Sequence, residues 1–376
     1  MSIETASIVI TPNAYKASKL YALKPTDGSG DLTVVRATTA TRVNSSGVIE
    51  EVLANVPRLD YTGGGCPSIL VEPQRTNLAL RSEEFDNASF WTLSNSGSIS
   101  VNTDVEPDGT TTADRLIAGA NFSQLQGSIV GTIDTAYTGS IYIKRINGSG
   151  VVNLRVAENA DIPITVTNEW TRVSATVTST TTTIRIGVKL ATSGDAIAIW
   201  GAQLEQGAYA TSYIPTVTEA VTRVKDVISR TDLYTNGLVT NSGGTWFVEL
   251  INNKDLIRDA PSNMFLGTST NGNDTAITIR SNSTTSAKLS IGARISGTIT
   301  SSRLIATETA KVLVKWNGVT CDFFINGTKY NAGTSFPFIE LNFLTIDGVD
   351  VPKYIKQMQF FPTPLTDLEC ETLTTL

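Results

Sequence analysis

Short stretches of alternating apolar and polar residues, separated by turn-forming residues, run along most of the chain. Residues 196–202 alternate small and apolar side chains, and residues 203–207 break that alternation. An apolar and aromatic run then continues to Ile214 and stops at Pro215. A period of two is typical of a half-buried strand, and proline ends such a run. This stretch therefore predicts the last strand of one β domain, which folds back on itself before the chain leaves for another domain.

Residues 77–215 carry dense strand signals. Residues 140–145 and 151–156 alternate cleanly and are joined by Asn-Gly-Ser-Gly at 147–150, which predicts a β-hairpin. Residues 170–177 and 183–189 alternate as well. Many short strands without a long helical period predict a β-sandwich or jelly roll. One register places apolar side chains on the inner face: Ile141, Ile143, Leu154, Val156, Ile184, Ile186 and Val188.

The opposite register mixes an aromatic ring with amide and cationic groups. It contains Tyr142, Lys144, Asn153, Arg155, Arg185 and Lys189. A ring can cover the apolar face of a sugar while amide and guanidinium groups donate to its hydroxyls. These six residues are therefore candidate glycan-binding residues on one outer face. The alternative is an ordinary solvated face, because exposed strands of any sandwich alternate polar residues in this way.

Residues 1–77 differ from the rest of the chain. They contain short strand signals near residues 12–23 and 32–41, and a segment at 56–73 that holds three consecutive glycines. Such a sequence lacks the periodicity needed for a core of its own. We expect it to lie extended against a neighbouring subunit or a larger assembly.

Residues 218–376 predict a second sandwich. Residues 219–229 fit a strand or a short helix, and candidate strands follow from residue 246 onward. The segment KWNGVTCDFFINGTKY predicts a type I′ turn at Asn317-Gly318, a returning strand and another turn at Asn326-Gly327. Near the end of the chain, Thr366 and Glu369 have capping-box spacing, which predicts a short terminal helix. Leu365, Leu368 and Leu373 are the residues available to pack that helix.

Composition narrows the function classes. The chain has no histidine, which excludes a Ser-His-Asp triad, a histidine metal site and a histidine proton shuttle. Its net charge of -6 argues against a nucleic-acid partner, because phosphates require a basic surface. Only 17% of residues are charged, below the ~25% usual for soluble domains, and short polar residues that suit strand faces and turns replace them.

Three cysteines, Cys66, Cys321 and Cys370, are far apart and odd in number, so we expect free and mostly buried thiols. The first residues lack the basic and apolar regions of a secretory signal, and no apolar run is long enough for a membrane span. Each of the five tryptophans lies in or beside a strand signal, which favours a core role over a sugar platform.

Several segments resemble known proteins. Residues 36–52 (RATTATRVNSSGVIEEV) and 69–91, which include EPQRTNL, resemble a cassette of bacteriophage tail and fibre proteins, especially of phages that infect Bacteroidetes. The segment AIWGAQLEQGAYATSYIPT is similar to the end of a jelly roll of the carbohydrate-binding-module type, and EPQRTNL together with QLEQGAYATSYIPT resembles sequences of phage origin. The C-terminal segment resembles concanavalin A-like or laminin G-like sandwiches. The resemblance implies a homotrimeric virion protein, a fibre or decoration on tail or capsid, that touches surface glycans.

Catalysis and metal binding have weaker support in the sequence. Concanavalin-like glucanases place acidic residues at alternate positions of one strand, whereas FVELIN at 247–252 has only Glu249. Asp347 and Asp350 flank a Gly-Val pair and are candidates for a Ca²⁺ site. The other interpretation is that these aspartates only form a turn.

We therefore expect an all-β chain with three parts: residues 1–77 as a virion-attachment or oligomerisation segment, 78–217 as a carbohydrate-binding-module-like jelly roll, and 218–376 as a concanavalin A-like or laminin G-like sandwich. The expected function is a non-catalytic virion protein without cofactor, exposed on the particle. Its expected partners are further copies of itself, phage capsid or tail proteins and host-surface polysaccharide, with no nucleic acid and no membrane insertion. The alternatives are a capsule depolymerase and an architectural decoration protein without ligand.

Overall fold

The computed structural model describes residues 3–158, 160–251, 262–268, 276–281, 289–295, 298–305, 309–335, 340–348 and 352–376. These residues form antiparallel β-strands almost throughout, so the predicted all-β class is confirmed. Within them the helices are a single 3-10 turn, η1 (Ile3–Thr5), and a single α-helix, α1 (Asp367–Thr374). The chain divides into two compact units. Unit 1 comprises residues 1–39, 52–74 and 224–376, and unit 2 comprises residues 40–51 and 75–223.

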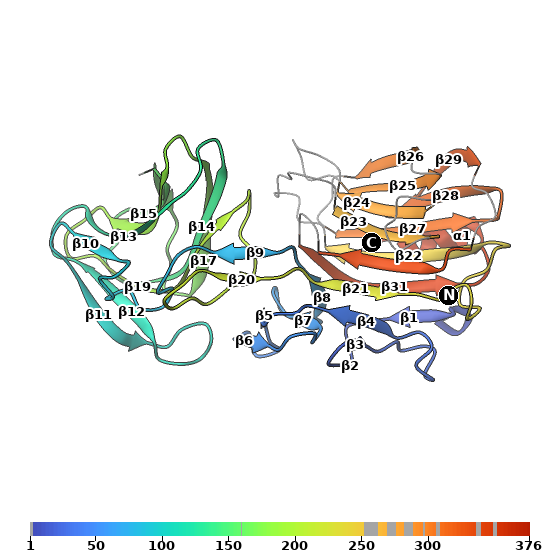
Figure 1. Cartoon of the computed structure of the whole chain (residues 1–376), viewed down its shortest axis with the longest axis horizontal. Helices are drawn as coiled ribbons and strands as arrows, with labels where there is room; N and C mark the ends of the chain where they lie inside the picture. The colour runs from blue at the N-terminus through green and yellow to red at the C-terminus, as the bar shows by residue number, and fades with distance from the viewer. Residues whose placement is uncertain are drawn as a thin grey trace. The chain divides into compact units, whose positions relative to one another are not determined.

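Unit 1 is a sandwich of two sheets (Figure 1). The first has the order β29-β28-β27-β22-β31-β8-β7, with β1 also paired to β31. Its strands are β1 (Ile8–Ile10), β7 (Arg58–Asp60), β8 (Ser68–Val71), β22 (Gly244–Ile251), β27 (Thr309–Trp316), β28 (Thr320–Ile325), β29 (Thr328–Ser335) and β31 (Lys353–Phe361).

The second sheet of unit 1 has the order β2-β3-β4-β21-β30-β23-β24-β25-β26. Its strands are β2 (Tyr15–Lys16), β3 (Lys19–Leu20), β4 (Leu32–Val35), β21 (Val227–Arg230), β23 (Ser262–Gly267), β24 (Ala276–Ser281), β25 (Leu289–Ile295), β26 (Thr298–Ile305) and β30 (Phe343–Asp347). The apolar side chains of both sheets share one buried core. That core includes Trp246 and Phe360, whose rings stack with centroids 5.8 Å apart.

The N-terminal residues supply strands to both sheets of unit 1. Ile8 pairs with Phe360, Ile69 pairs with Ile355, and Val34 pairs with Ile228. All of these side chains are buried in the common core. The expectation of an N-terminal segment extended against another molecule is therefore corrected. These residues lack a periodicity of their own because they join sheets whose other strands come from residues 224–376. The predicted boundaries 1–77, 78–217 and 218–376 are therefore replaced by those of the two units.

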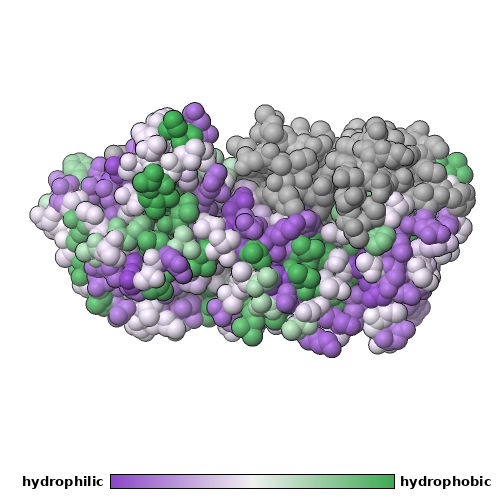
Figure 2. Space-filling view, viewed as in Figure 1, coloured by the Kyte–Doolittle hydropathy of each residue, from purple (hydrophilic) through white to green (hydrophobic). Residues whose placement is uncertain are grey.

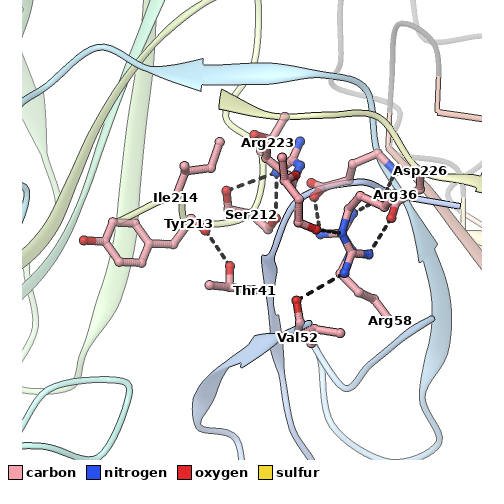
Figure 3. A network of polar contacts seen from close by, with 12 residues as sticks. Arg36, Thr41, Val52, Arg58, Ser212, Tyr213, Ile214, Arg223 and Asp226 are labelled. Atoms are coloured by element: carbon pink, nitrogen blue, oxygen red, sulfur yellow. Dashed lines mark hydrogen bonds and ion pairs between the residues drawn. The ribbon is translucent and has the colours of Figure 1, made fainter. Parts of the chain in front are cut away.

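Buried ion pairs also join the N-terminal residues to the rest of unit 1 (Figure 3). The Asp226 carboxylate accepts from Arg36, with 2.8 Å between Nη1 and Oδ1, and from Arg58 through its other oxygen. Arg58 also donates to Glu72 over 2.6 Å. Gly348 lies against this cluster, and a Cβ there would be 2.1 Å from the carbonyl oxygen of Glu72. The close approach explains a glycine at this position.

The C-terminal hairpin forms largely as predicted. Strands β27, β28 and β29 follow one another in register. Asn326 and Gly327 have φ of 47° and 80°, as a type I′ turn requires. The first turn is different, because only Gly318 has a positive φ there and the side chain of Asn317 accepts from the backbone of Val319 and Thr320 instead. The type I′ prediction for Asn317-Gly318 is therefore wrong.

The terminal helix α1 has the predicted capping box, in which Thr366 and Glu369 each bond to the other's backbone. Leu365 is buried and Leu373 packs against a small cluster with Phe324. Leu368 is 73% exposed, so its predicted packing role is wrong. Residues 219–229, left open between strand and helix, form β20 (Val221–Arg223) and the start of β21.

Unit 2 is a sandwich of two five-stranded sheets (Figure 1). We call the first the Trp200 sheet, after a residue of β19. It has the order β11-β12-β19-β14-β17, with β11 (Gly97–Asp104), β12 (Ala113–Ala118), β14 (Ala136–Asn147), β17 (Thr171–Thr178) and β19 (Ala196–Gln206). The Arg155 sheet has the order β10-β13-β18-β15-β16, with β10 (Thr92–Ser94), β13 (Ser123–Val130), β15 (Val152–Ala157), β16 (Ala160–Ile164) and β18 (Thr183–Leu190). Two further pairs are β9 (Arg75–Asn77) with β20, and β5 (Ala40–Val43) with β6 (Ile49–Val52).

The seven apolar residues predicted to face inward in unit 2 are all buried in its core. The hairpin predicted between residues 140–145 and 151–156 is wrong, because β14 pairs with β17 and β19 while β15 pairs with β16 and β18. The chain crosses from one sheet to the other at 148–151. Glycines are needed there because a Cβ at Gly148 would lie 1.8 Å from the Asp195 carboxylate.

The three cysteines are free as predicted, although Cys66 is exposed. Four tryptophans are buried, at positions 91, 200, 246 and 316, which confirms a core role for them; Trp170 is half-buried. Among the described residues, no helix has the length and apolar character needed to cross a bilayer. Figure 2 shows hydrophilic and hydrophobic residues interspersed over the visible surface of the described residues.

Candidate functional site

The structure separates the six predicted glycan-binding residues. Tyr142 and Lys144 lie on β14 of the Trp200 sheet. Asn153, Arg155, Arg185 and Lys189 lie on β15 and β18 of the Arg155 sheet. Since the core fills the space between the two sheets, the outer faces point in opposite directions. The prediction of one shared face is therefore wrong, and four of the six residues remain together.

Tyr142 is a packing residue. Its ring centroid lies 5.4 Å from that of Trp200 and 6.5 Å from that of Tyr213, and the Arg172 guanidinium lies 5.4 Å from it. Lys144 lies 5.5 Å from the ring centroid of Trp170. Val43 and Ile49 of the β5–β6 pair belong to the same aromatic cluster. The outer face of the Trp200 sheet is thus covered by segments of unit 2 itself.

The covering segment is the run after β19 that ends at Pro215. Gln203 and Glu205 are fully buried, and their side chains bind the backbone of this segment. The side-chain amide oxygen of Gln203 accepts from the backbone N–H of Ile214 over 2.7 Å. The Glu205 carboxylate accepts from the backbone N–H of Thr211 over 3.0 Å. Thr41 of β5 donates to the backbone oxygen of Tyr213 over 2.6 Å (Figure 3). The motif QLEQGAYATSYIPT therefore closes this face.

Asn77 of the EPQRTNL motif joins the same arrangement. Its amide nitrogen donates to the backbone oxygens of Ala202 and Ile214, over 3.1 and 2.8 Å. Its amide oxygen accepts from the backbone of Ala79 and Leu204, each over 3.0 Å. The side chain is fully buried, and all four contacts are to backbone groups. The two motifs that carry the phage resemblance thus have a structural role in unit 2.

Arg155 organises the outer face of the Arg155 sheet. Register places Gly187 of β18 between Arg155 on β15 and Gln126 on β13. Because Gly187 has no side chain, the Arg155 side chain crosses β18 and donates through Nη1 to the amide oxygens of Gln124 and Gln126, over 2.7 and 2.5 Å. Its Nε donates to Asp161 on β16 over 3.0 Å. One guanidinium thus links β13, β15 and β16 across β18.

We call this outer surface the Arg155 face. It comprises the side chains of Gln124, Gln126, Asn153, Arg155, Asp161, Arg185 and Lys189. Arg155 itself is almost buried, with a side chain 7% exposed, whereas Asp161 beside it is 35% exposed. The face is therefore a polar surface on which the central Arg155 is held by hydrogen bonds to its neighbours, while Asp161 beside it is open to solvent.

The amides of this face are oriented by Arg155. Both Gln124 and Gln126 use their oxygens to accept from it, which leaves their NH₂ groups as donors. Within the described part of the chain, neither amide nitrogen has a hydrogen-bond partner, and the same holds for the amide of Asn153. Gln124 and Gln126 are half-buried, so their NH₂ groups are the amide donors that this face offers to a ligand, whereas Asn153 is only 9% exposed.

An exposed aromatic ring stands at one end of the Arg155 face. Phe122 is 53% exposed and has a φ of 63°, which is uncommon for a residue with a side chain. The ammonium of Lys189 lies 5.2 Å from its ring centroid and pairs with Asp161 over 2.5 Å. Ring, cation and amides therefore adjoin one another on a single surface.

Sequence reasoning missed four residues of this site: Phe122, Gln124, Gln126 and Asp161. A usable signal was present for two of them, because SQLQG at 123–127 places Gln124 and Gln126 at alternate positions around buried Leu125. Phe122 and Asp161 gave no comparable signal, since Phe122 directly precedes β13 and Asp161 lies on β16, a strand that the sequence did not predict.

The candidate Ca²⁺ site is only partly described. Asp347 ends β30, and its carboxylate pairs with Lys225 over 2.9 Å. Asp350 lies outside the described residues. No group of three or more His, Cys, Asp or Glu side chains gathers as metal ligands in the described parts of the chain. Glu249, the counterpart of a glucanase acid, accepts from Gln357 over 2.7 Å on β31.

Comparison with known proteins finds no matching family model and no matching curated protein. Solved structures with similar folds include the CBM22-1 xylan-binding domain of Paenibacillus barcinonensis Xyn10C, with 11% identity over 35% of this chain and 92% of that one, at a TM-score of 0.26. A CBM4 structure has 16% identity over 34% and 99%, at 0.26. Domain 4 of the arabinanase AbnA from Geobacillus stearothermophilus has 11% identity over 44% and 82%, at 0.30. At these values none of them fixes a family or a ligand for the chain.

Proposed function

We propose that unit 2 is a glycan-binding module whose ligand lies along the Arg155 face. The observation that carries this proposal is the bridge formed by Arg155 over Gly187, which fixes two amides with their NH₂ groups free. Sugar hydroxyls are both donors and acceptors, and preorganised amides can bind them without losing much side-chain entropy.

The exposed ring complements these polar groups. Phe122 offers a flat apolar surface next to Lys189, and such a ring covers the C–H face of a sugar. The opposite outer face of unit 2 is closed by Tyr213 and the segment around it. The Arg155 face is accordingly the sheet surface on which this proposal places the ligand.

A glycan array probed with the full chain tests this proposal, followed by calorimetry on the best ligand. Phe122→Ala is expected to weaken binding at least tenfold, with little change in melting temperature. The double variant Gln124→Ala with Gln126→Ala is expected to weaken binding at least tenfold and to lower the melting temperature, because the almost buried Arg155 loses two of its acceptors. Val101→Ala is the matched control, because Val101 is 46% exposed on β11 of the other sheet. Unchanged affinity in both face variants would refute the assignment of the site.

We also propose that the protein is a virion component, attached to a phage tail or capsid as a homotrimer. Support comes from the resemblance of residues 36–52, EPQRTNL and QLEQGAYATSYIPT to phage tail and fibre proteins. Immunogold labelling of purified particles and light scattering of the isolated protein test the two parts. A protein that is found only outside the particle, or that is monomeric at all concentrations, contradicts them.

The function that we propose is non-catalytic. A depolymerase is the alternative, and it is distinguished by reducing ends released from a polysaccharide that the protein binds. Binding without release supports the module, whereas sustained release at catalytic protein concentrations would replace it with an enzyme.

A further inference from the structure

We propose that the glycan carries acidic groups, and that Arg185 is the residue that binds them. This inference rests on the proposed glycan-binding function of the Arg155 face. The shared chemistry is an anionic oxygen group on a sugar, either a carboxylate or a sulfate.

The first observation is the charge of the face. Arg155 and Lys189 both pair with Asp161, over 3.0 and 2.5 Å. Arg185 adds a third cation, so this surface carries more positive than negative side chains although the chain as a whole has a net charge of -6. A local excess of cations in an acidic protein attracts anions to that surface.

The second observation is the state of Arg185. Its side chain is half-buried, and among the described residues its guanidinium has no hydrogen-bond or ion-pair partner. Glu158 follows the residue paired with Arg185, and its carboxylate accepts from the backbone of Thr180 over 2.8 Å rather than from Arg185. Arg185 is thus the cation of this face whose charge is uncompensated by the described part of the chain.

The third observation is the space around Arg185. Its register neighbours are Ser128 on β13 and Ala157 on β15, both with small side chains. The planar guanidinium can therefore approach an anionic group from the solvent side with two parallel N–H donors. A lysine would offer only a point charge at this position.

The fourth observation is the distance between the two ends of the face. Arg185 and Lys189 are four residues apart on one side of β18, which separates their Cα atoms by about 13 Å in an extended strand. Phe122 stands at the Lys189 end. A ligand that uses both ends must span more than one sugar ring, so we infer an acidic oligosaccharide segment with a ring on Phe122 and an acid group on Arg185.

The test uses the full chain on an array of neutral, uronic-acid-containing and sulfated oligosaccharides, then calorimetry at low and high salt. We expect the tightest ligands to be acidic, and carboxyl reduction or desulfation of the bound ligand to weaken binding at least tenfold. The chemical treatment that abolishes binding distinguishes carboxylate from sulfate. Arg185→Gln is expected to weaken binding of the acidic ligand at least tenfold, or about 1.4 kcal/mol. Its affinity for the neutralised form of that ligand should equal that of the wild type.

Two further variants separate charge from geometry. Arg185→Lys keeps the charge and loses the paired donors, so it should bind less tightly than the wild type and more tightly than Arg185→Gln. Lys16→Gln is the control: it removes one positive charge from an exposed position of unit 1 and should leave the affinity for the acidic ligand unchanged.

The outcomes keep this inference apart from the proposed function. If the ligands are neutral, or if Arg185→Gln binds acidic ligands like the wild type while Phe122→Ala loses them, the acid inference is overturned and the glycan-binding module stands. If no glycan binds at any salt concentration, both are overturned.

Discussion

Arg36 and Asp226 lie 190 positions apart in the sequence and form a buried ion pair, with 2.8 Å between Nη1 and Oδ1. The Arg36 guanidinium also donates to the backbone oxygen of Val52 over 3.2 Å (Figure 3). It donates to the backbone oxygen of Leu53 over 2.7 Å as well. A buried arginine of this kind requires every partner, because an unpaired charge in the interior is costly. The pair therefore ties the N-terminal strands of unit 1 to the segment that follows unit 2 in the sequence.

Asp226→Asn is expected to destabilise unit 1 by about 3–5 kcal/mol, the range for removing one partner of a buried ion pair. The amide keeps the shape of the side chain but leaves Arg36 and Arg58 without a shared counter-ion. Urea denaturation followed by tryptophan fluorescence measures the loss. Asp232→Asn is the matched control at a carboxylate 45% exposed, where a change within about 1 kcal/mol is expected. Equal effects of the two substitutions would contradict the importance of the buried cluster.

Removal of residues 1–74 is expected to prevent residues 224–376 from folding. Strand β8 pairs with β31 and strand β4 with β21, so the deletion exposes the edges of both sheets and removes Ile8, Ile69 and other core residues. Far-UV circular dichroism and amide exchange of a fragment that contains only residues 224–376 measure whether it folds. Co-expression with residues 1–74 as a separate polypeptide should restore the fold. A stable, cooperatively folded fragment on its own would show that these strands are accessory.

Tyr142→Ala and Phe122→Ala are expected to separate stability from binding. Tyr142 is half-buried and packs against Trp200 and the Arg172 guanidinium, so its loss should cost about 2 kcal/mol, below the range for a fully buried aromatic. Phe122 is exposed, so its loss should affect ligand binding and spare the melting temperature. Calorimetric melting and ligand titration of both variants measure the two effects. Reversed effects would mean that the ligand lies on the Trp200 sheet.

The sequence was informative about which side of a strand faces the core and uninformative about which sheet a strand joins. Ile141 and Leu154 were both predicted to point inward, and both are fully buried. Their strands nevertheless belong to different sheets, because alternation has the same period in either one. Tyr142 and Arg155 were therefore assigned to one face although they lie on opposite faces of unit 2.

Long-range pairing accounts for the other differences. Residues 1–77 showed no periodicity of their own because many of their partners are distant in the sequence: Val34 pairs with Ile228, 194 residues later, and Ile8 pairs with Phe360, 352 residues later. Arg155 was found as a candidate, but its bridge depends on Gly187 and on Gln126 of another strand. Such a site can be recognised only when the register of three strands is known.

Glu83 provides a pH-dependent test of packing in unit 2. Burial raises the pKa of its carboxyl above the ordinary value of 4.5, and this outweighs the hydrogen bond that Tyr213 donates to it over 2.8 Å. A carboxyl with a raised pKa in the folded state binds its proton more tightly there than in the unfolded chain. Its stabilising contribution is therefore complete below pH 4.5 and is lost as the pH rises through the higher folded value.

Glu83→Gln keeps an acceptor for Tyr213 and cannot ionise, so the stability of this variant relative to the wild type should increase as the pH rises above 4.5. Urea denaturation at several pH values between about 3 and 7 measures the difference. Glu106→Gln is the control of opposite sign. Despite burial, hydrogen bonds from Thr110 and Thr112 lower the pKa of Glu106, so this variant should be less stable than the wild type at neutral pH, with the deficit shrinking as the pH falls below 4.5. Parallel pH profiles for the two variants would contradict the opposite environments that the structure gives these carboxyl groups.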